Sequence, residues 1–361
     1  DVVILFSVLT LEHETEGFYL KTIELPESHI ELIKEVKNIN PKTILVLSNG
    51  SAISMLQWIN DVPAVIEAYL LGQAGGGAIA DVLFGKENPS GKLAETFPIR
   101  LEHNPAYLNY PGEAGKVRYG EGLYVGYRYY DKKEIEPMFP FGFGLSYTTF
   151  SYSNLTVSKE SFKDAEGVTV NVDITNTGEV PGKEIVQLYV HQSNPKLDRP
   201  YKELKGFSKL ELQPNETKTA TFHLDSRTFA YYSINHNSWI WESGEYDILI
   251  GASSKDIRLN TTVTLESTQE LSSILNMDST VSDWINDPKG EPIIDEIIAQ
   301  RVNFLKSQNP DLEIDEKQVK EEFLSPAIQD MPLVRIFKFA EKYLPMPAED
   351  LVKLLLTRVK G

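Results

Sequence analysis

The hydrophobic pattern of this chain changes its period along the sequence, and this change limits the domains that it can form. In residues 1–100, short apolar runs alternate with stretches of helical spacing, which indicates β-α-β units and a parallel sheet. In residues 151–266, apolar and polar residues alternate one by one between turn signals, which indicates a β-sandwich. Residues 267–361 return to helical spacing with more charge. The sequence therefore predicts a multi-domain protein.

The first of these regions contains three expected strands and three expected helices. The strands are Asp1–Phe6, which we expect to be buried, Thr43–Leu47 and Ala64–Leu71. The helices are Ser28–Ile39, a helix from the N-cap Ser51 through Trp58, and Ala78–Phe84, closed by Gly85. A chain rarely opens inside a core strand without an initiator Met. We therefore expect a C-terminal part of a longer protein, in which a missing signal peptide carries no information.

Three further regions follow. Residues 101–150 are rich in Tyr, Gly and Pro, and we expect an extended linker there. In residues 151–266, Val168, Val170, Val172 and Ile174 alternate with polar residues, in the style of an immunoglobulin or fibronectin type III sandwich. Residues 267–361 predict a small helical extension with helices at Ile293–Leu305, Leu333–Tyr343 and Leu351–Val359. The last helix is amphipathic but has no strongly cationic face, which disfavours a membrane-surface helix.

The amino-acid composition excludes several classes of partner and site. The formal net charge is −17, which disfavours nucleic acid and anionic membrane surfaces as partners, because both attract Lys and Arg. The absence of cysteine excludes disulfides, thiolate catalysis and Cys-based metal sites. The six histidines have no metal-ligand spacing on one helix, and no apolar run approaches the length of about 18 residues that spans a membrane. Neutral ligands such as sugars remain compatible. The compartment stays open, with the bacterial cytoplasm preferred to secretion.

Two local motifs are weak when read from their residues alone. Gly72–Gly77 separates a strand from a helix, but neither the dinucleotide pattern nor the Walker pattern is complete, so close backbone packing is preferred to phosphate binding and no cofactor is expected. Leu11–Pro26 is an acidic loop after the first strand, with Glu12, Glu14 and Glu16. Loops at the carboxyl ends of parallel strands carry chemistry, so Glu16 is a candidate general acid; a solvated acidic loop is the preferred local interpretation.

Several longer strings resemble glycoside hydrolase family 3. They are Asn88–Pro98 (NPSGKLAETFP), Gly122–Asp131 (GLYVGYRYYD), Pro140–Thr148 (PFGFGLSYT), Glu203–Phe207 (ELKGF) and Gly251–Arg258 (GASSKDIR). They occur in the order and spacing of that family, in the style of bacterial β-glucosidases. The resemblance implies that residues 1–100 are the later part of an α/β sandwich domain and that residues 151–266 are a fibronectin type III-like domain. It also implies that an N-terminal (β/α)8 barrel lies outside this chain.

The resemblance also suggests roles for residues of the acidic loop. Glu14–Phe18 (ETEGF) is similar to the start of the family string that carries the acid/base, which implies that Glu16 is the acid/base and that Glu14 is the fallback. The chain departs from the pattern at Tyr19 and Leu20, where Asp-Arg usually follows. The family's nucleophile, an Asp, lies on the barrel and is therefore not in this chain.

The resemblance implies a retaining glycosidase, in which two carboxyl groups lie about 5–5.5 Å apart. The acid/base must be protonated, which requires burial or a nearby negative charge. Without the barrel we expect the chain alone not to hydrolyse glycosides. A non-catalytic structural or interaction fragment is the alternative from another class. A phosphorylase with His13 as acid/base is less favoured, because such relatives lack the fibronectin-like domain. β-Glucosides are the leading substrates, ahead of β-xylosides, β-galactosides and α-arabinosides, and the oligomeric state stays open.

Overall fold

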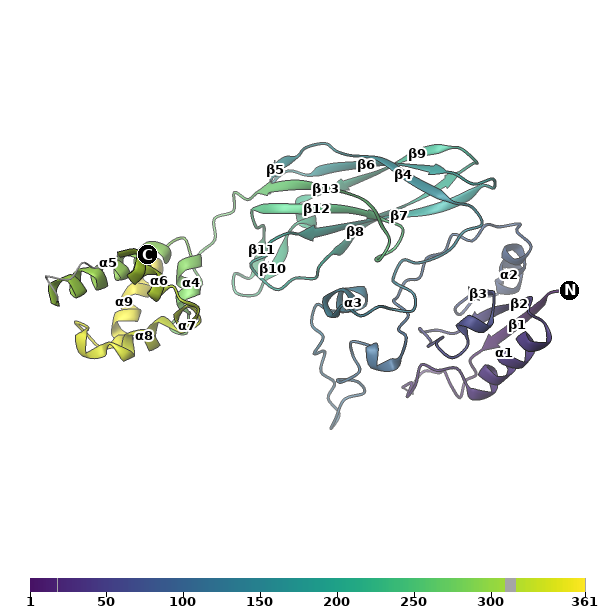
Figure 1. Ribbon diagram of the computed structural model, residues 1–361, viewed down its shortest axis with the longest axis horizontal. Helices are drawn as coiled ribbons and strands as arrows, with labels where there is room; N and C mark the ends of the chain where they lie inside the picture. The colour runs from purple at the N-terminus through teal and green to yellow at the C-terminus, as the bar shows by residue number, and fades with distance from the viewer. Residues whose placement is uncertain (18, 309–315, 361) are drawn as a thin grey trace. The chain divides into compact units, whose positions relative to one another are not determined.

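The computed structural model describes residues 1–17, 19–308 and 316–360 (Figure 1). Phe18 of the acidic loop lies outside the described residues. The chain divides into two compact units. The first consists of Asp1–Tyr231 and Trp241–Thr268, and the second of Tyr232–Ile240 and the chain from Gln269 onward. Both units are described separately below.

A three-stranded parallel sheet opens the first unit, as the β-α-β pattern predicts. Its strands are β1 (Val3–Val8), β2 (Thr43–Ser48) and β3 (Ala64–Glu67), in the order β1-β2-β3. The central strand is the most apolar, and Leu45, Val46 and Leu47 are fully buried. Helix α1 (Glu27–Ile39) buries Ile30 and Ile33 in the same core. The parallel arrangement places the carboxyl ends of all three strands at one edge of the sheet.

Strand β1 is not the buried strand that the sequence predicts. Among the described strands it pairs with β2 alone, so one of its edges is unpaired, and the side chains on one of its faces are also exposed. The exposed fractions are 57% for Val2, 37% for Ile4, 54% for Phe6 and 49% for Val8. An unbroken apolar run predicts a strand with two covered faces, but it does not say which segments cover them.

The helix predicted for Ser51–Trp58 is also wrong. This stretch is irregular and ends in the short 3-10 helix η1 (Ile59–Asp61). Ser54 lies beside Glu24 in an isolated parallel bridge, with the Ser54 N–H donating to the Ile23 carbonyl over 2.7 Å. Trp58 is buried at 1% exposure. These long-range contacts override a local N-cap signal, because burial of a tryptophan outweighs a marginal helical turn.

The segment between the sheet and the sandwich contains more regular structure than an extended linker. After α2 (Gly75–Leu83), the chain forms η2 (Leu101–His103) and α3 (Tyr127–Lys133). Glu134 ends α3 in a left-handed conformation, with φ at 54°. The aromatic residues anchor this segment, as Tyr127 stacks on Phe141 with ring centroids 5.1 Å apart.

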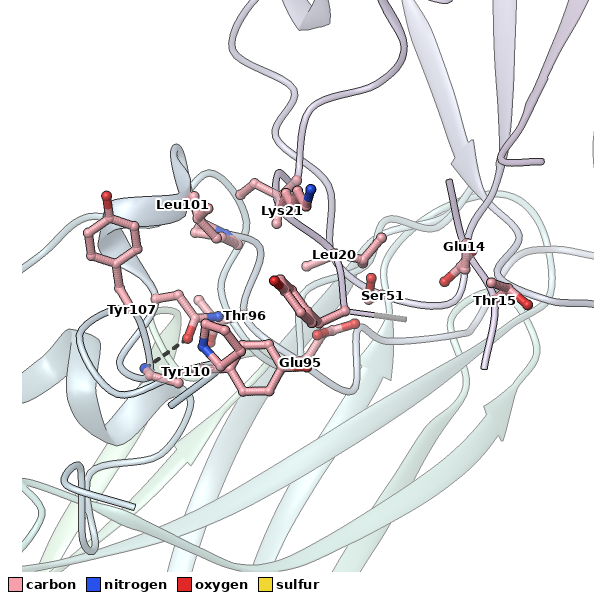
Figure 2. A pocket seen from close by; sticks show the side chains of 17 residues that line it. Glu14, Thr15, Leu20, Lys21, Ser51, Glu95, Thr96, Leu101, Tyr107 and Tyr110 are labelled. Carbon is pink, nitrogen blue, oxygen red and sulfur yellow. Dashed lines mark hydrogen bonds between the residues drawn. The ribbon is translucent and has the colours of Figure 1, made fainter. Parts of the chain in front are cut away.

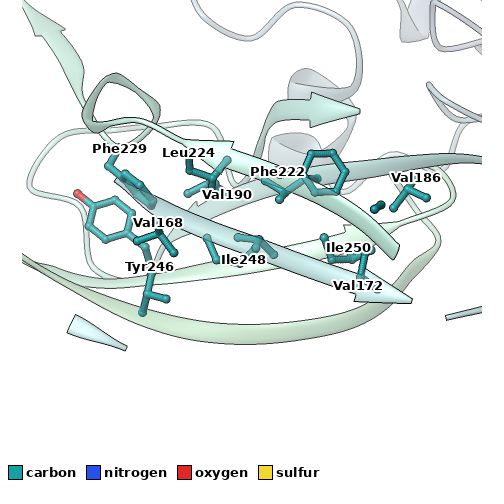
Figure 3. Close-up of a cluster of buried hydrophobic side chains, with 14 of the residues drawn as sticks. Val168, Val172, Val186, Val190, Phe222, Leu224, Phe229, Tyr246, Ile248 and Ile250 are labelled. Atoms are coloured by element: carbon teal, nitrogen blue, oxygen red, sulfur yellow. The ribbon is translucent and has the colours of Figure 1, made fainter. Parts of the chain in front are cut away.

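The predicted sandwich is present. Its five-stranded sheet has the order β5-β13-β12-β7-β8, and its three-stranded sheet has the order β4-β6-β9. The strands are β4 (Phe150–Val157), β5 (Ser161–Lys163), β6 (Val168–Asn176), β7 (Gly182–Gln192), β8 (Glu203–Leu212), β9 (Thr217–Leu224), β12 (Gly244–Gly251) and β13 (Ile257–Glu266). Inward-facing side chains of the two sheets form one apolar core (Figure 3). Val168, Val170, Val172 and Ile174 all lie in it, as their alternation predicts.

Buried charges join the sandwich to the segment before it. Lys202 Nζ lies 2.5 Å from Asp131 Oδ2, and the two side chains are 4% and 6% exposed. Burial lowers the pKa of Lys202 from its ordinary value, and the Asp131 carboxylate only partly opposes this shift. Lys255 Nζ lies 3.4 Å from the other Asp131 oxygen.

A second group of charges surrounds Glu203 at the start of β8. Burial raises the pKa of its carboxyl, but the positive charges of Lys205, Arg128 and Arg199 outweigh burial and hold this pKa below its ordinary value. The Arg128 Nη2 atom lies 3.1 Å from Glu203 Oε1. Because Arg128 and Asp131 both come from α3, this helix is tied to the sandwich by the three charged contacts of these two residues.

The second unit is helical, as predicted. Its helices are α4 (Val281–Asn286), α5 (Glu291–Gln308), α6 (Glu316–Phe323), α7 (Pro326–Gln329), α8 (Leu333–Phe339) and α9 (Ala348–Lys360), with the 3-10 helix η4 (Glu341–Tyr343). The short strands β10 (Tyr231–Ser233) and β11 (Ser238–Ile240) pair with each other. Trp284 is fully buried in the helical core. No helix among the described residues is long and apolar enough to cross a membrane.

Candidate functional site

The carboxyl ends of the three parallel strands gather polar side chains from separate parts of the chain. The acidic loop follows β1, Asn49 follows β2, and Glu67 ends β3. This is the edge at which α/β sheets place their functional loops. The candidate site is therefore built around the turn Asn49–Ala52.

The Glu14 side chain contacts the backbone at Gly50. Both of its carboxylate oxygens accept the Gly50 N–H at 2.8 Å. A Cβ built on Gly50 would lie 2.4 Å from Glu14 Oε1, so glycine is required for this approach. The contact fastens the acidic loop to the turn after β2.

Two more carboxyl groups hold the same turn. Glu67 Oε2 accepts the Asn49 side-chain amide at 3.2 Å, and Glu67 Oε1 accepts the Tyr69 N–H at 2.9 Å. Glu95 faces the same turn, where the nearby Ala52 N–H partly opposes the larger effect of burial on its pKa. Burial raises the pKa of both Glu67 and Glu95 above the ordinary value. The direction of both shifts is the one expected when a carboxyl group is taken out of water, because burial disfavours its charged form.

Glu16 differs from its neighbour Glu14. Its side chain is exposed, and the next residue, Gly17, makes a turn with φ at +83°. The acidic loop therefore presents one glutamate inward, on Gly50, and one outward. His13 Nδ1 lies 2.9 Å from Thr10 Oγ1 within the same loop, and its side chain is exposed.

A cavity of about 740 Å³ opens beside this loop (Figure 2). Its polar lining residues are Glu14, Thr15, Lys21, Ser51, Glu95, Thr96 and Asn104. Its aromatic and apolar lining residues are Tyr19, Leu20, Ile23, Ala52, Pro98, Leu101, Ala106, Tyr107, Tyr110 and Pro111. A concave site of this size with a few polar groups fits a small molecule. Glu16 itself does not line the cavity, but its neighbours Glu14 and Thr15 do.

Sequence reasoning did not single out Glu67 and Glu95 as site residues. Glu95 stands inside Asn88–Pro98, a string that served only to establish the resemblance. Glu67 is the only charged residue in Ala64–Leu71, and a lone charge at the carboxyl end of a predicted strand is the signal that could have found it. Within the described residues, no group of His, Asp or Glu side chains has the geometry of a metal site.

Comparison with known proteins adds the following findings. The sequence model described as "Glycosyl hydrolase family 3 C-terminal domain" matches residues 1–147, and the one described as "Fibronectin type III-like domain" matches residues 184–254. Thermostable beta-glucosidase B of Acetivibrio thermocellus is 45% identical over 361 residues, which are 100% of this chain and 46% of that protein. An exo-alpha-(1->6)-L-arabinopyranosidase of Bifidobacterium breve is 44% identical over 299 residues, 83% of this chain and 39% of that protein.

A solved structure is similar as well. The crystal structure of a GH3 beta-glucosidase from Bifidobacterium adolescentis superposes with a TM-score of 0.76 at 44% identity and covers 81% of this chain. The match spans 43% of that chain. The present chain therefore spans less than half the length of these relatives.

Proposed function

Because this chain belongs to glycoside hydrolase family 3, we propose that it is the C-terminal part of a retaining β-glucosidase, supplying the acid/base of the reaction. The enzyme would remove terminal β-D-glucosyl residues from the non-reducing end of its substrate. The nucleophile, an Asp, would come from a (β/α)8 barrel outside this chain. Relatives named as β-glucosidases support the substrate class. The arabinopyranosidase relative keeps other sugars open, with a β-xyloside as the alternative.

Within this proposal, Glu16 is the acid/base rather than Glu14. One observation carries the choice: the Glu14 carboxylate is held in place by the Gly50 N–H, which its two oxygens share, whereas Glu16 is exposed. An acid/base must reach the glycosidic oxygen at hydrogen-bond distance and must exchange its proton with water. A carboxylate fixed on the backbone of its own domain is poorly placed for either task.

The chemistry divides between two carboxyl groups. The nucleophile attacks the anomeric carbon, while the protonated Glu16 donates to the departing oxygen. In the second step the Glu16 carboxylate takes a proton from water, and this water releases the sugar. The chain described here supplies one of these two groups, so we expect no hydrolysis by the chain alone.

A chimera tests the assignment. This chain would be joined to the part of the Acetivibrio thermocellus relative that it does not match, and release of 4-nitrophenol from 4-nitrophenyl β-D-glucoside would be followed. We expect turnover by the chimera and none by the chain alone. In the chimera, Glu16→Ala should lower the rate of hydrolysis of a substrate with a poor leaving group by about 10²–10⁴-fold. Sodium azide should restore turnover of 4-nitrophenyl β-D-glucoside by this variant and yield β-glucosyl azide. Glu12→Ala, a change at an exposed glutamate of the same loop, is the matched control and should keep the rate.

The outcome separates the two glutamates. Azide rescue in Glu14→Ala but not in Glu16→Ala would transfer the role to Glu14. Full turnover in Glu16→Ala would remove the acid/base role from Glu16. Turnover by the chain alone that Glu16→Gln abolishes would contradict the division between two polypeptide segments.

A non-catalytic interaction module is the second candidate function. The open apolar face of β1 favours it, since Val2, Phe6 and Val8 are each about half exposed. A patch of this kind marks a surface that packs on another polypeptide. If the chain binds a separately expressed barrel domain but Glu16→Ala has no effect on turnover by the chimera, a packing role is the better description.

A further inference from the structure

The acidic loop is fixed to the sheet at two points before it reaches Glu16. The Leu9 N–H donates to the Ser48 carbonyl over 3.2 Å, where β1 ends. The Glu14 carboxylate then accepts the Gly50 N–H at 2.8 Å. Glu16 follows two residues later, and two residues of extended chain span at most about 7 Å. The position of Glu14 therefore limits where the Glu16 side chain can lie.

The direction of the Gly50 N–H depends on the side chain before it. This N–H belongs to the planar peptide unit that joins Asn49 to Gly50. Asn49 is 1% exposed, and its side-chain amide donates to the Ser51 carbonyl over 2.9 Å and to Glu67 Oε2 over 3.2 Å. Asn49 is thus held on both sides of Gly50, and the peptide unit that binds Glu14 is held with it.

Glu67 is itself oriented by the backbone after β3. Its Oε1 atom accepts the Tyr69 N–H at 2.9 Å, which leaves Oε2 for Asn49. The Tyr69 carbonyl in turn accepts the Ser48 hydroxyl at 2.9 Å. Tyr69 has a left-handed backbone with φ at 52°, which is unusual for a large side chain. Such a conformation persists only where its surroundings fix it, and it is concentrated at functional sites.

The charges at this edge show that the two glutamates face one turn. Burial raises the pKa of Glu67, and the hydrogen bonds from Tyr69 and Asn49 partly oppose this shift. The negative charges of Glu95 and Glu14 raise the same pKa further. Glu67 therefore repels Glu14 through space while it supports Glu14 through Asn49 and Gly50. Replacing Glu67 removes both effects, so the response of the loop shows which of them is larger.

We propose that Asn49 and Glu67 are positioning residues for the acid/base, and that they act through Gly50 and Glu14 on the loop that carries Glu16. The proposal rests on the proposed function, because it takes Glu16 as the acid/base. Neither residue takes part in proton transfer. The loop after β1, the turn after β2 and the end of β3 then hold Glu16 as one unit.

The leaving group of the substrate distinguishes positioning of the acid from general damage to the fold. Departure of methanol from methyl β-D-glucoside requires a proton from the acid/base, whereas 2,4-dinitrophenolate departs without one. The value of kcat/KM reports the step in which the leaving group departs. In the chimera, Asn49→Ala and Glu67→Ala should lower kcat/KM for methyl β-D-glucoside by roughly tenfold to a hundredfold. For 2,4-dinitrophenyl β-D-glucoside it should stay within about twofold of the parent chimera.

Matched variants keep this test specific. Glu14→Gln retains one oxygen that can accept the Gly50 N–H and should keep the parent ratio of the two kcat/KM values, whereas Glu14→Ala should lower it. Gln57 Nε2 donates to Glu24 Oε2 over 3.2 Å, the same length as the bond between Asn49 and Glu67. Gln57→Ala should therefore leave the ratio unchanged. An equal loss for both substrates in Glu67→Ala and Glu14→Ala, or no loss in either variant, would overturn the proposal.

Proteolysis of the 361-residue chain reads the position of the loop without any turnover. Endoproteinase Glu-C cleaves after glutamate, and mass spectrometry would follow the cut between Glu16 and Gly17. A loop that is held in place is cut only when it opens. Asn49→Ala and Glu67→Ala should each speed this cut by about twofold to tenfold, the value of one hydrogen bond, and Gln57→Ala should not. An unchanged rate of cleavage in both variants would overturn the proposal.

Failure of this proposal and failure of the proposed function give different results. If the chimera is inactive while Asn49→Ala and Glu67→Ala speed the cut after Glu16, the two residues hold the loop and the enzyme assignment is wrong. If the chimera is active and Glu16→Ala impairs it, but Glu67→Ala changes neither the ratio of kcat/KM values nor the cut, the proposed function stands and the positioning role is wrong.

Discussion

Loss of the Asp131 carboxylate should destabilise the sandwich far more than loss of its lysine partner. In Asp131→Asn, Lys202 keeps a charge at 4% exposure, and the described part of the chain offers it no other carboxylate within hydrogen-bond distance. Breaking a buried pair in this way costs about 3–5 kcal/mol of the free energy of unfolding. In Lys202→Met, Asp131 still faces Lys255 at 3.4 Å. The lowered pKa of Lys202 indicates that burial already penalises its charge, so this variant should lose less than about 2 kcal/mol.

Hydrogen exchange of the β7 and β8 amides at increasing urea measures the sandwich separately from the other domains, since a chain of several domains does not unfold in one step. The exposed pair Lys132–Asp198 is the matched control. It has a similar distance of 2.6 Å, but its side chains are 48% and 63% exposed, so Asp198→Asn should leave the unfolding free energy unchanged within error. A Lys202→Met loss as large as that of Asp131→Asn, or an Asp131→Asn loss no larger than that of Asp198→Asn, would refute the reasoning.

Three further predictions concern the glutamates of the first unit. Gly50→Ala should displace Glu14 and speed amide exchange at position 50 by at least about tenfold, the value of one charge-assisted hydrogen bond; unchanged exchange would contradict the contact. Because the pKa of Glu95 is raised, the folded state binds its proton more tightly, and wild-type stability falls as pH rises above 4.5. Glu95→Gln lacks this fall. In urea unfolding, the free energy of unfolding of the variant relative to the wild type should therefore be higher at pH 7 than at pH 4. An equal difference at both pH values would contradict the raised pKa of Glu95. The pKa of Glu203 is lowered, so its effect on stability has the opposite sign. Its stabilising contribution is present above pH 4.5 and is lost as the pH falls through the lowered pKa. Glu203→Gln should therefore reduce the loss of unfolding free energy at acid pH, and an unchanged loss would exclude the charges around Glu203 as its cause.

The periodic parts of the fold follow from the sequence because their signals are local. Val168 and Ile174 alternate with polar residues in β6, and this alternation alone places them in the sandwich core. The helical spacing of Ile30 and Ile33 likewise identifies the buried face of α1. The prediction that the first strand is buried is wrong, because its neighbours, and not its own residues, decide how much of it is covered. The domain boundaries at about 100, 150 and 266 stay predictions.

The site was less predictable than the fold. The acidic loop was identified, but the distinction between Glu14 and Glu16 depends on Gly50, which is 36 residues further along the chain. Glu95, which is 43 residues beyond Ala52, faces the same turn, and no periodic sequence pattern predicts such a long-range contact. The helix expected at Ser51 failed for the same reason, since long-range contacts fix the backbone there. The acid/base role of Glu16 stays a prediction.

The hydrogen bond between Glu14 and Gly50 also affects chemical degradation of the protein. An Asn-Gly pair is prone to deamidation, in which the glycine nitrogen attacks the asparagine side-chain carbon, ammonia leaves, and the resulting succinimide opens to aspartate or isoaspartate. Asn49 and Gly50 form such a pair, but the Gly50 N–H is held by Glu14. The Asn49 amide, 1% exposed, donates to Glu67 and to the Ser51 carbonyl. Both reacting groups are thus fixed, and the turn that positions the acidic loop is shielded from this damage for as long as the sheet edge stays folded.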